Sequence, residues 1–202
     1  MNLIKSKTPN TAWPFKLDKM QSFAFNKKAF TPQECAKIIT SASFIKSDEA
    51  KVIVAGGAKH DVKRRSTEIT WLQSTDNDMS WVFERLTDLI QDLNEKYFRF
   101  KLFGFIEGVQ FTRYRVGDFY EPHVDNLYNR PTRKLSITVQ LTEPSKYTGG
   151  ELKLHYSTVL TPTPKEQGTL IVFPSFVLHE VTPVTKGERI SLVSWITGPD
   201  FN

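Results

Sequence analysis

The chain has 202 residues, of which 39% are hydrophobic and 24% charged, and its formal net charge is +5. These values are typical of one globular domain and exclude a disordered or low-complexity chain. The charge is mildly basic, without the clustering that a dedicated nucleic-acid binder needs. The single cysteine, Cys35, excludes an internal disulfide and a cysteine-based zinc cluster, and it fits a reducing compartment.

No membrane or export segment is expected. The first ten residues lack the apolar stretch of a signal peptide, and no window approaches about 18 uninterrupted apolar residues. We therefore expect a cytoplasmic protein with no membrane partner. The sequence leaves the oligomeric state open.

The first half of the chain is predicted to contain an arm, a strand and a helix. Residues 1–20 are expected to form an irregular arm, and residues 23–25 a short strand. The tetrapeptide 31–34 (Thr-Pro-Gln-Glu) has the N-cap, proline and capping-box pattern of a helix start. We expect this helix to end near Ser43.

A polar segment follows and is predicted to be a long loop. Residues 46–68 contain a glycine pair and at most a short strand at 51–54. The basic run 63–65 (Lys-Arg-Arg) has two interpretations, a solvated charge run or a mobile lid that grips the substrate. His60 in this segment is expected to be solvated.

A second helix is predicted next, with Asp76, Asp78 or Ser80 as its cap. Its apolar residues recur at helical spacing and should form one buried stripe. The stripe comprises Val82, Leu86, Leu89, Ile90, Leu93 and Tyr97.

From about residue 100 the hydrophobic period changes from that of a helix to that of a strand. We expect strands at 108–115, 134–141, 151–156, 169–173 and 189–197, separated by Gly and Pro turn signals. Helices followed by many strands predict an α+β fold. Its core would be an antiparallel barrel or double-sheet roll, with the N-terminal helices packed on one outer face.

A pair of metal-ligand side chains lies in His123-Val124-Asp125, because residues i and i+2 of an extended segment point the same way. His179, after an apolar strand, is the candidate third ligand. Two imidazoles and one carboxylate form the facial triad of non-haem iron(II) enzymes. Alone, the first pair also fits a surface turn, and His179 also fits a satisfied core histidine.

A second candidate site lies on the last strand. Arg189 and Ser191 share one face there, and a guanidinium with a hydroxyl can hold a carboxylate. A strand-borne arginine is otherwise a solvated edge charge. His155 is expected at the surface, and Trp195 in the core.

Five sequence segments support the metal interpretation together. They are Tyr114-x-x-Gly117-x-Phe119-Tyr120-x-x-His123-x-Asp125, Leu135-Ser136-x-Thr138-Val139-x-Leu141, Tyr147-x-Gly149-Gly150-Glu151-Leu152, Phe173-Pro174-Ser175, and His179-x-Val181-x-Pro183-Val184-x-x-Gly187-x-Arg189-x-Ser191. In this order they resemble the iron(II)- and 2-oxoglutarate-dependent dioxygenases of the prolyl-4-hydroxylase-like branch, which includes the PKHD-type hydroxylases.

The resemblance implies a double-stranded β-helix of the jelly-roll or cupin type at residues 104–199, supported by residues 21–103 in one domain of 202 residues. It implies iron(II) bound by His123, Asp125 and His179, and 2-oxoglutarate held by Arg189. Tyr114 and the polar strand face formed by Ser136, Thr138 and Gln140 would line the cosubstrate pocket; that face could otherwise be exposed to solvent.

The implied reaction uses dioxygen and 2-oxoglutarate to hydroxylate a C–H bond of a peptidyl proline or another amino-acid side chain, with ascorbate as a reductant. Related nucleic-acid demethylases carry a second arginine six residues after the first, where this chain has Trp195. This difference argues against a nucleic-acid substrate. The alternative is a carboxylate- or sugar-binding β-roll module without oxidative activity.

Overall fold

The computed structural model describes residues 22–45, 48–49, 52–54, 57–59, 64–76, 78–126, 132–156 and 159–200. The predicted arm at 1–20, His60 and Lys63 lie outside these residues. Among the described residues, neither α-helix is long and apolar enough to cross a membrane.

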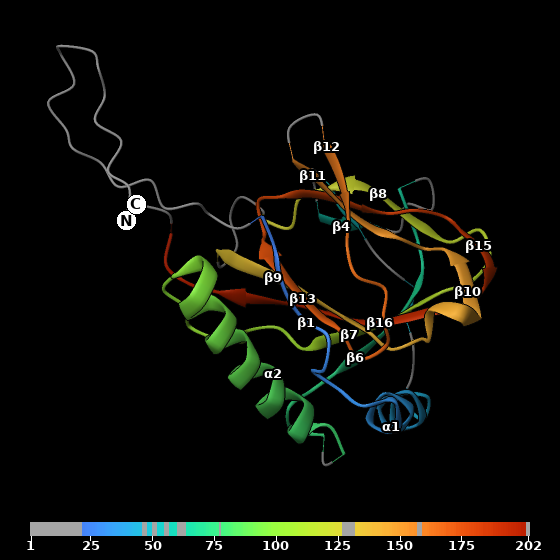
Figure 1. Cartoon of the computed structure of the whole chain (residues 1–202), viewed down its shortest axis with the longest axis horizontal. Helices are drawn as coiled ribbons and strands as arrows, with labels where there is room; N and C mark the ends of the chain where they lie inside the picture. Colours follow the sequence, from blue (N-terminus) through green and yellow to red (C-terminus); the bar gives the residue numbers. More distant parts are fainter. Residues whose placement is uncertain are drawn as a thin grey trace, which may run out of the picture.

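Two antiparallel sheets face each other and form the body of the molecule (Figure 1). The larger sheet has the strand order β1 (Ala24–Asn26), β13 (Leu170–Pro174), β9 (Arg133–Gln140), β16 (Arg189–Thr197), β7 (Val109–Tyr114), β6 (Glu68–Leu72) and β2 (Asp48–Glu49). The smaller sheet has the order β12 (Val159–Pro162), β11 (Leu152–Tyr156), β14 (Leu178–Val181), β8 (Phe119–His123) and β5 (Arg65–Ser66). Together they confirm the predicted double-sheet roll.

Two short ribbons complete the strands. They are β3 (Val52–Val54) with β4 (Gly57–Lys59), and β10 (Tyr147–Gly149) with β15 (Val184–Gly187). A 3-10 turn, η2 (Pro144–Lys146), leads into β10.

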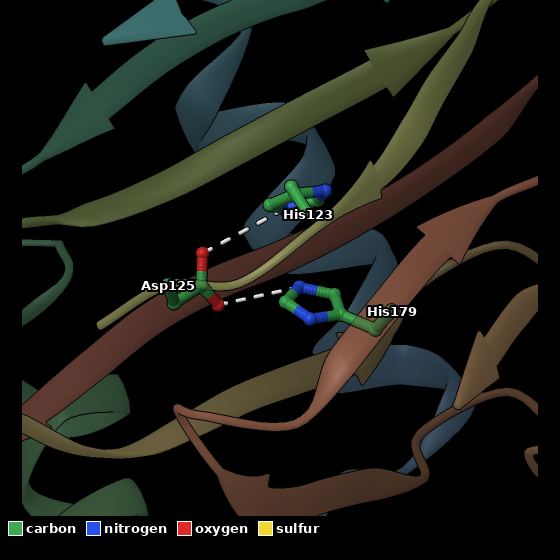
Figure 2. A group of neighbouring side chains, drawn as sticks. All are labelled: His123, Asp125 and His179. Atoms are coloured by element: carbon green, nitrogen blue, oxygen red, sulfur yellow. Dashed lines mark ion pairs between the residues drawn. The ribbon is translucent and has the colours of Figure 1, made fainter. Parts of the chain in front are cut away.

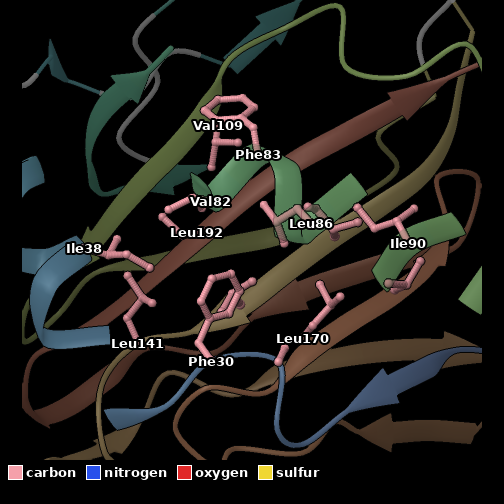
Figure 3. Packing of buried hydrophobic residues seen from close by; sticks show 14 of the residues in the cluster. Phe30, Ile38, Val82, Phe83, Leu86, Ile90, Val109, Leu141, Leu170 and Leu192 are labelled. Atoms are coloured by element: carbon pink, nitrogen blue, oxygen red, sulfur yellow. The ribbon is translucent and has the colours of Figure 1, made fainter. Parts of the chain in front are cut away.

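Both α-helices, α1 (Pro32–Ala42) and α2 (Ser80–Leu93), cover the outer face of the larger sheet, opposite the smaller sheet (Figure 1). Alternate residues of the central strands point toward the helices, as the period of two predicts. Figure 3 shows this core with Phe30, Ile38, Val82, Phe83, Leu86, Ile90, Val109, Leu141, Leu170 and Leu192 labelled. This apolar layer leaves the other face of the larger sheet for the site.

Local sequence determines the start of α1. Thr31 is the N-cap, its Oγ1 accepts a hydrogen bond from Glu34 N, and the Glu34 side chain accepts from Thr31 N at 2.8 Å. The helix ends with Ser43 as its C-cap, as expected.

The N-cap of α2 was predicted incorrectly. Its N-cap is Met79, with no side-chain cap, because the Asp76 carboxylate instead accepts a hydrogen bond from Gln73 N at 2.8 Å. The predicted apolar stripe holds through Leu93, but Tyr97 is exposed. There the chain forms a π-helical turn, η1 (Asn94–Phe98), which rotates the later residues out of the stripe.

The segment 46–68 is also more regular than predicted. It contains β2 to β5 and the start of β6, and β2 and β6 extend the larger sheet. Strand β5 pairs with β8, which carries His123. A segment predicted as a loop thus supplies an edge strand to the sheet of the candidate metal centre.

Candidate metal centre

Three predicted ligands converge between the two sheets, although they come from different parts of the chain (Figure 2). His123 ends β8, Asp125 follows it, and His179 lies on β14, paired with His123 across the smaller sheet. The backbone N–H groups of Asp125 and Asn126 both donate to Ser175 O at 3.0 Å. These bonds hold the segment after β8 against the turn before β14.

The ligand atoms are close enough to share one ion, since they all lie within 4.8 Å of one another. Asp125 Oδ1 is 3.7 Å from His123 Nε2, and Asp125 Oδ2 is 3.3 Å from His179 Nε2. Two imidazole nitrogens and one carboxylate oxygen suit a divalent transition metal such as iron(II).

Backbone carbonyls orient both imidazole rings. His123 Nδ1 lies 2.8 Å from Glu121 O, and His179 Nδ1 lies 2.9 Å from Val177 O. A carbonyl only accepts, so each Nδ1 carries a proton, and Nε2 is the ring nitrogen that faces the centre and would bind a metal in its deprotonated form. The arrangement therefore fits metal coordination.

Asp125 is fixed by two further contacts. Ser136 Oγ donates to Asp125 Oδ2 at 2.7 Å and also contacts Ser175 Oγ at 3.0 Å. Arg133, which is paired with Glu107 at 2.6 Å, lies 3.4 Å from the Asp125 backbone carbonyl. Ser136 on the polar face of β9 thus supports the carboxylate of a candidate metal ligand.

The charges of the three groups depend on one another. Burial opposes ionisation of Asp125, but the His179 charge and hydrogen bond outweigh it and lower the pKa of the carboxyl. Burial likewise opposes protonation of His179, and Asp125 outweighs it and raises the His179 pKa above its ordinary value. Burial and the His179 charge together lower the pKa of His123 to about 3. The metal-free site therefore favours an anionic Asp125 beside a protonated His179.

The predicted carboxylate site lies in the same interior. Arg189 is 1% exposed, and its Nη2 donates to Gln140 Oε1 at 3.0 Å. Its guanidinium carbon lies 5.4 Å from the centre of the Tyr114 ring. Gly150 has φ +57°, and a Cβ there would lie 3.0 Å from Arg189 Cδ, so the glycine leaves room for the arginine. The interpretation of Arg189 as a solvated edge charge is therefore wrong.

The other predicted pocket residues occupy the same face. Thr138 and Ser191 are buried, and Ser191 Oγ lies 2.7 Å from Thr112 Oγ1. Every residue of β9 is buried, so the alternative of a solvent-exposed polar face is wrong. The smaller sheet covers this polar face of the larger sheet, and the helices cover the opposite, apolar face.

Tyr147 also belongs to this pocket, beside Arg189; its sequence segment was recognised, but no role was predicted for this residue. It is buried, and its hydroxyl has no hydrogen-bond partner among the described residues. Burial raises the pKa of the Tyr147 phenol, and the charge of neighbouring Arg189 opposes the shift. Its place two residues before the Gly149-Gly150 pair was the available signal.

Arg65 contradicts the prediction of a solvated basic run. It is 5% exposed and points into the roll, where its Nη2 donates to Gln110 Oε1 on β7 at 3.2 Å. Its guanidinium carbon lies 4.5 Å from the centre of the Tyr120 ring. Arg64, the preceding residue, is exposed. Strand pairing with β8 explains the difference, because neighbouring strand residues point to opposite faces.

The remaining predictions concern Trp195 and His155. Trp195 is buried as expected, with the Arg133 guanidinium carbon 3.6 Å from the centre of its ring. His155 is only partly exposed, and its Nε2 lies 3.5 Å from Glu180 Oε1, away from the three candidate ligands.

The second half of the chain is similar in sequence to known proteins. Residues 109–197 match the sequence profile of the 2OG-Fe(II) oxygenase superfamily. A PKHD-type hydroxylase of Prochlorococcus marinus (strain MIT 9211) is 40% identical over 92 residues, which are 45% of this chain and 42% of the relative. A PKHD-type hydroxylase of Pseudoalteromonas atlantica is 31% identical over 147 residues, covering 68% of this chain and 65% of the relative.

The fold has solved counterparts. A Pseudomonas putida prolyl-4-hydroxylase superposes with a TM-score of 0.72 over 89% of this chain and 94% of its own, at 20% identity. This similarity confirms the predicted double-stranded β-helix. The alignment with the first of the curated relatives spans less than half of that relative's length.

Proposed function

Because the chain belongs, through residues 109–197, to the 2OG-Fe(II) oxygenase superfamily, we propose that it is an iron- and 2-oxoglutarate-dependent dioxygenase that hydroxylates a C–H bond. One observation carries the proposal. A cluster of two imidazoles and a carboxylate lies in the same buried interior as Arg189, an arginine with no carboxylate within 4.0 Å among the described residues. A metal site and an anion site in one interior match the needs of this reaction.

In this proposal His123, Asp125 and His179 hold iron(II), and Arg189 pairs with the distal carboxylate of 2-oxoglutarate. When bound, iron(II) with 2-oxoglutarate and dioxygen supplies the oxidising power, and 2-oxoglutarate is converted to succinate and carbon dioxide. Ascorbate would serve as an auxiliary reductant.

The chain's own residues bind and orient. The carbonyls of Glu121 and Val177 hold the two rings with Nε2 inward, and Ser136 holds the Asp125 carboxylate. Tyr114, Thr138 and Ser191 would line the cosubstrate pocket, supported by their burial on the face that carries Arg189. Enclosure between two sheets excludes water and strengthens the contacts of Arg189 with an anion.

The proposed substrate is a peptidyl proline or another amino-acid side chain, in the cytoplasm. The names of the relatives support this class, because they describe hydroxylases, and the Pseudomonas putida protein is a prolyl-4-hydroxylase. Trp195, in place of a second arginine, argues against a nucleic-acid substrate.

Succinate formation tests the reaction. The iron(II)-loaded protein should convert 2-oxoglutarate to succinate in an oxygen-dependent manner, faster with proline peptides or amino acids than without them. Asp125→Asn should lose this activity, whereas His155→Gln, outside the cluster, should retain it. A binding module would give no succinate and no visible charge-transfer band on anaerobic addition of iron(II) and 2-oxoglutarate.

A further inference from the structure

Arg65 is a buried cation that the proposed function does not use. Its Nη2 has one partner, the neutral amide of Gln110, and its Nε is buried without a hydrogen-bond partner among the described residues. Nor does any carboxylate of the described chain lie within 4.0 Å of its guanidinium. Arg133, which is similarly buried, has Glu107 at 2.6 Å. A carboxylate of the chain thus neutralises the buried guanidinium of Arg133, whereas Arg65 has no such partner among the described residues.

A buried guanidinium without a counter-charge is costly, because it has lost its hydration. An anionic ligand would restore charge-assisted hydrogen bonds to the free donors. The planar fork of arginine suits a carboxylate in particular. The surroundings of Arg65 therefore suit a carboxylate ligand, and the described residues place no carboxylate beside it.

Arg65 lies beside the candidate metal centre. The ring of Tyr120 is 4.5 Å from the Arg65 guanidinium carbon and stacks on His123 with ring centres 3.5 Å apart. A register shift between β14 and β8 allows Tyr120 and His123 to contact each other. One aromatic ring thus contacts both Arg65 and a candidate metal ligand. A small ligand could reach the guanidinium and the centre at once.

The charge balance of the interior supports the same conclusion. The charges of a divalent cation, Asp125, Arg189 and the 2-oxoglutarate dianion would cancel, with the histidines neutral. Arg65 then leaves one positive charge in the buried interior. A substrate carboxylate paired with Arg65 would neutralise that charge locally.

We propose that Arg65, supported by Gln110 and Tyr120, binds a free carboxylate of the primary substrate. The substrate class is then a free amino acid or the C-terminal residue of a peptide, hydroxylated a short carbon chain away from its carboxylate. This inference rests on the proposed function and narrows its substrate.

Matched acids and amides test the carboxylate. The probes are the common L-amino acids, which represent the free substrate, their N-acetyl derivatives, which represent a C-terminal residue, and the N-acetyl amides, which lack the charge. Binding is measured by calorimetry on protein loaded with Mn(II) and 2-oxoglutarate, and on metal-free protein. At least one acid should bind about tenfold or more tightly than its amide in the loaded protein. The metal-free protein should show the same preference, weakened.

Two variants test whether the preference for acids over amides depends on Arg65. Arg65→Gln should reduce it to less than about threefold, while the affinities for Mn(II) and 2-oxoglutarate and the melting temperature show that the fold and the metal site remain. Arg64→Gln changes the exposed neighbour and should keep the full preference. If Arg65→Gln does not fold, Arg65→Lys, which keeps the charge but loses the fork, should retain an intermediate preference.

Three results would overturn the inference: equal binding of acids and amides, an unchanged preference in Arg65→Gln, or no binding by any acid. Failure of the proposed function is a separate result, seen as absent Mn(II) or 2-oxoglutarate binding or absent succinate formation. The metal-free titrations still decide the role of Arg65 in that case, because Arg65 and Gln110 are not among the metal-ligand candidates.

Discussion

Replacement of Arg189 by methionine removes the buried charge of the proposed cosubstrate site while keeping an unbranched side chain. Arg189 is 1% exposed, so its hydrogen bonds to a carboxylate would form away from water. Loss of such a pair should cost about 2–4 kcal/mol of binding free energy. The dissociation constant for 2-oxoglutarate should then rise by roughly 30- to 1000-fold.

Anaerobic titration of the iron(II)-loaded protein with 2-oxoglutarate measures this change. Iron(II) affinity should stay within about threefold of the wild type, because Arg189 is not one of the three candidate ligands. Lys186→Met, an exposed change on neighbouring β15, is the matched control. Arg189→Met also removes the hydrogen bond that Arg189 donates to Gln140, and thermal denaturation measures how far this loss lowers the stability of the variant. A 2-oxoglutarate affinity that falls less than threefold, or falls only in proportion to lost iron, would refute the role of Arg189.

Three further predictions concern the metal site and the fold. His123→Ala or His179→Ala should weaken iron(II) binding by more than about 100-fold, with far-UV circular dichroism unchanged; His155→Ala, as control, should not. Iron(II) affinity should rise with pH, up to about tenfold per unit, until the raised pKa of His179 is passed, because the metal must displace the His179 proton. Equal affinity at pH 6 and pH 7 would contradict this. Thr31→Ala should lower the free energy of unfolding by about 1 kcal/mol in urea, and Thr31→Ser should restore most of it.

The features that the sequence predicted correctly depend on neighbours in the chain or on a complete motif. The start of α1 depends on Thr31 and Glu34, three residues apart, and needs no tertiary contact to be recognised. The central strands follow from their period of two. The candidate ligands, whose ligand atoms all lie within 4.8 Å of one another, were located because two of them share one short motif and the third begins the segment that also contains Arg189.

Only tertiary structure decided the features that depend on which strands pair. The sequence of β9 alternates like a half-exposed strand, yet both of its faces are buried, because the helices cover one and the smaller sheet the other. Arg65 reads as part of a solvated run, but pairing of β5 with β8 turns it inward onto Tyr120. Such pairings join residues far apart in the chain. The hydrophobic period of a strand is a local property, so it does not predict which strand will pair with it. The sequence by itself determined the first helix, the central strands and the candidate metal ligands, whereas strand register decided which charged side chains surround those candidates.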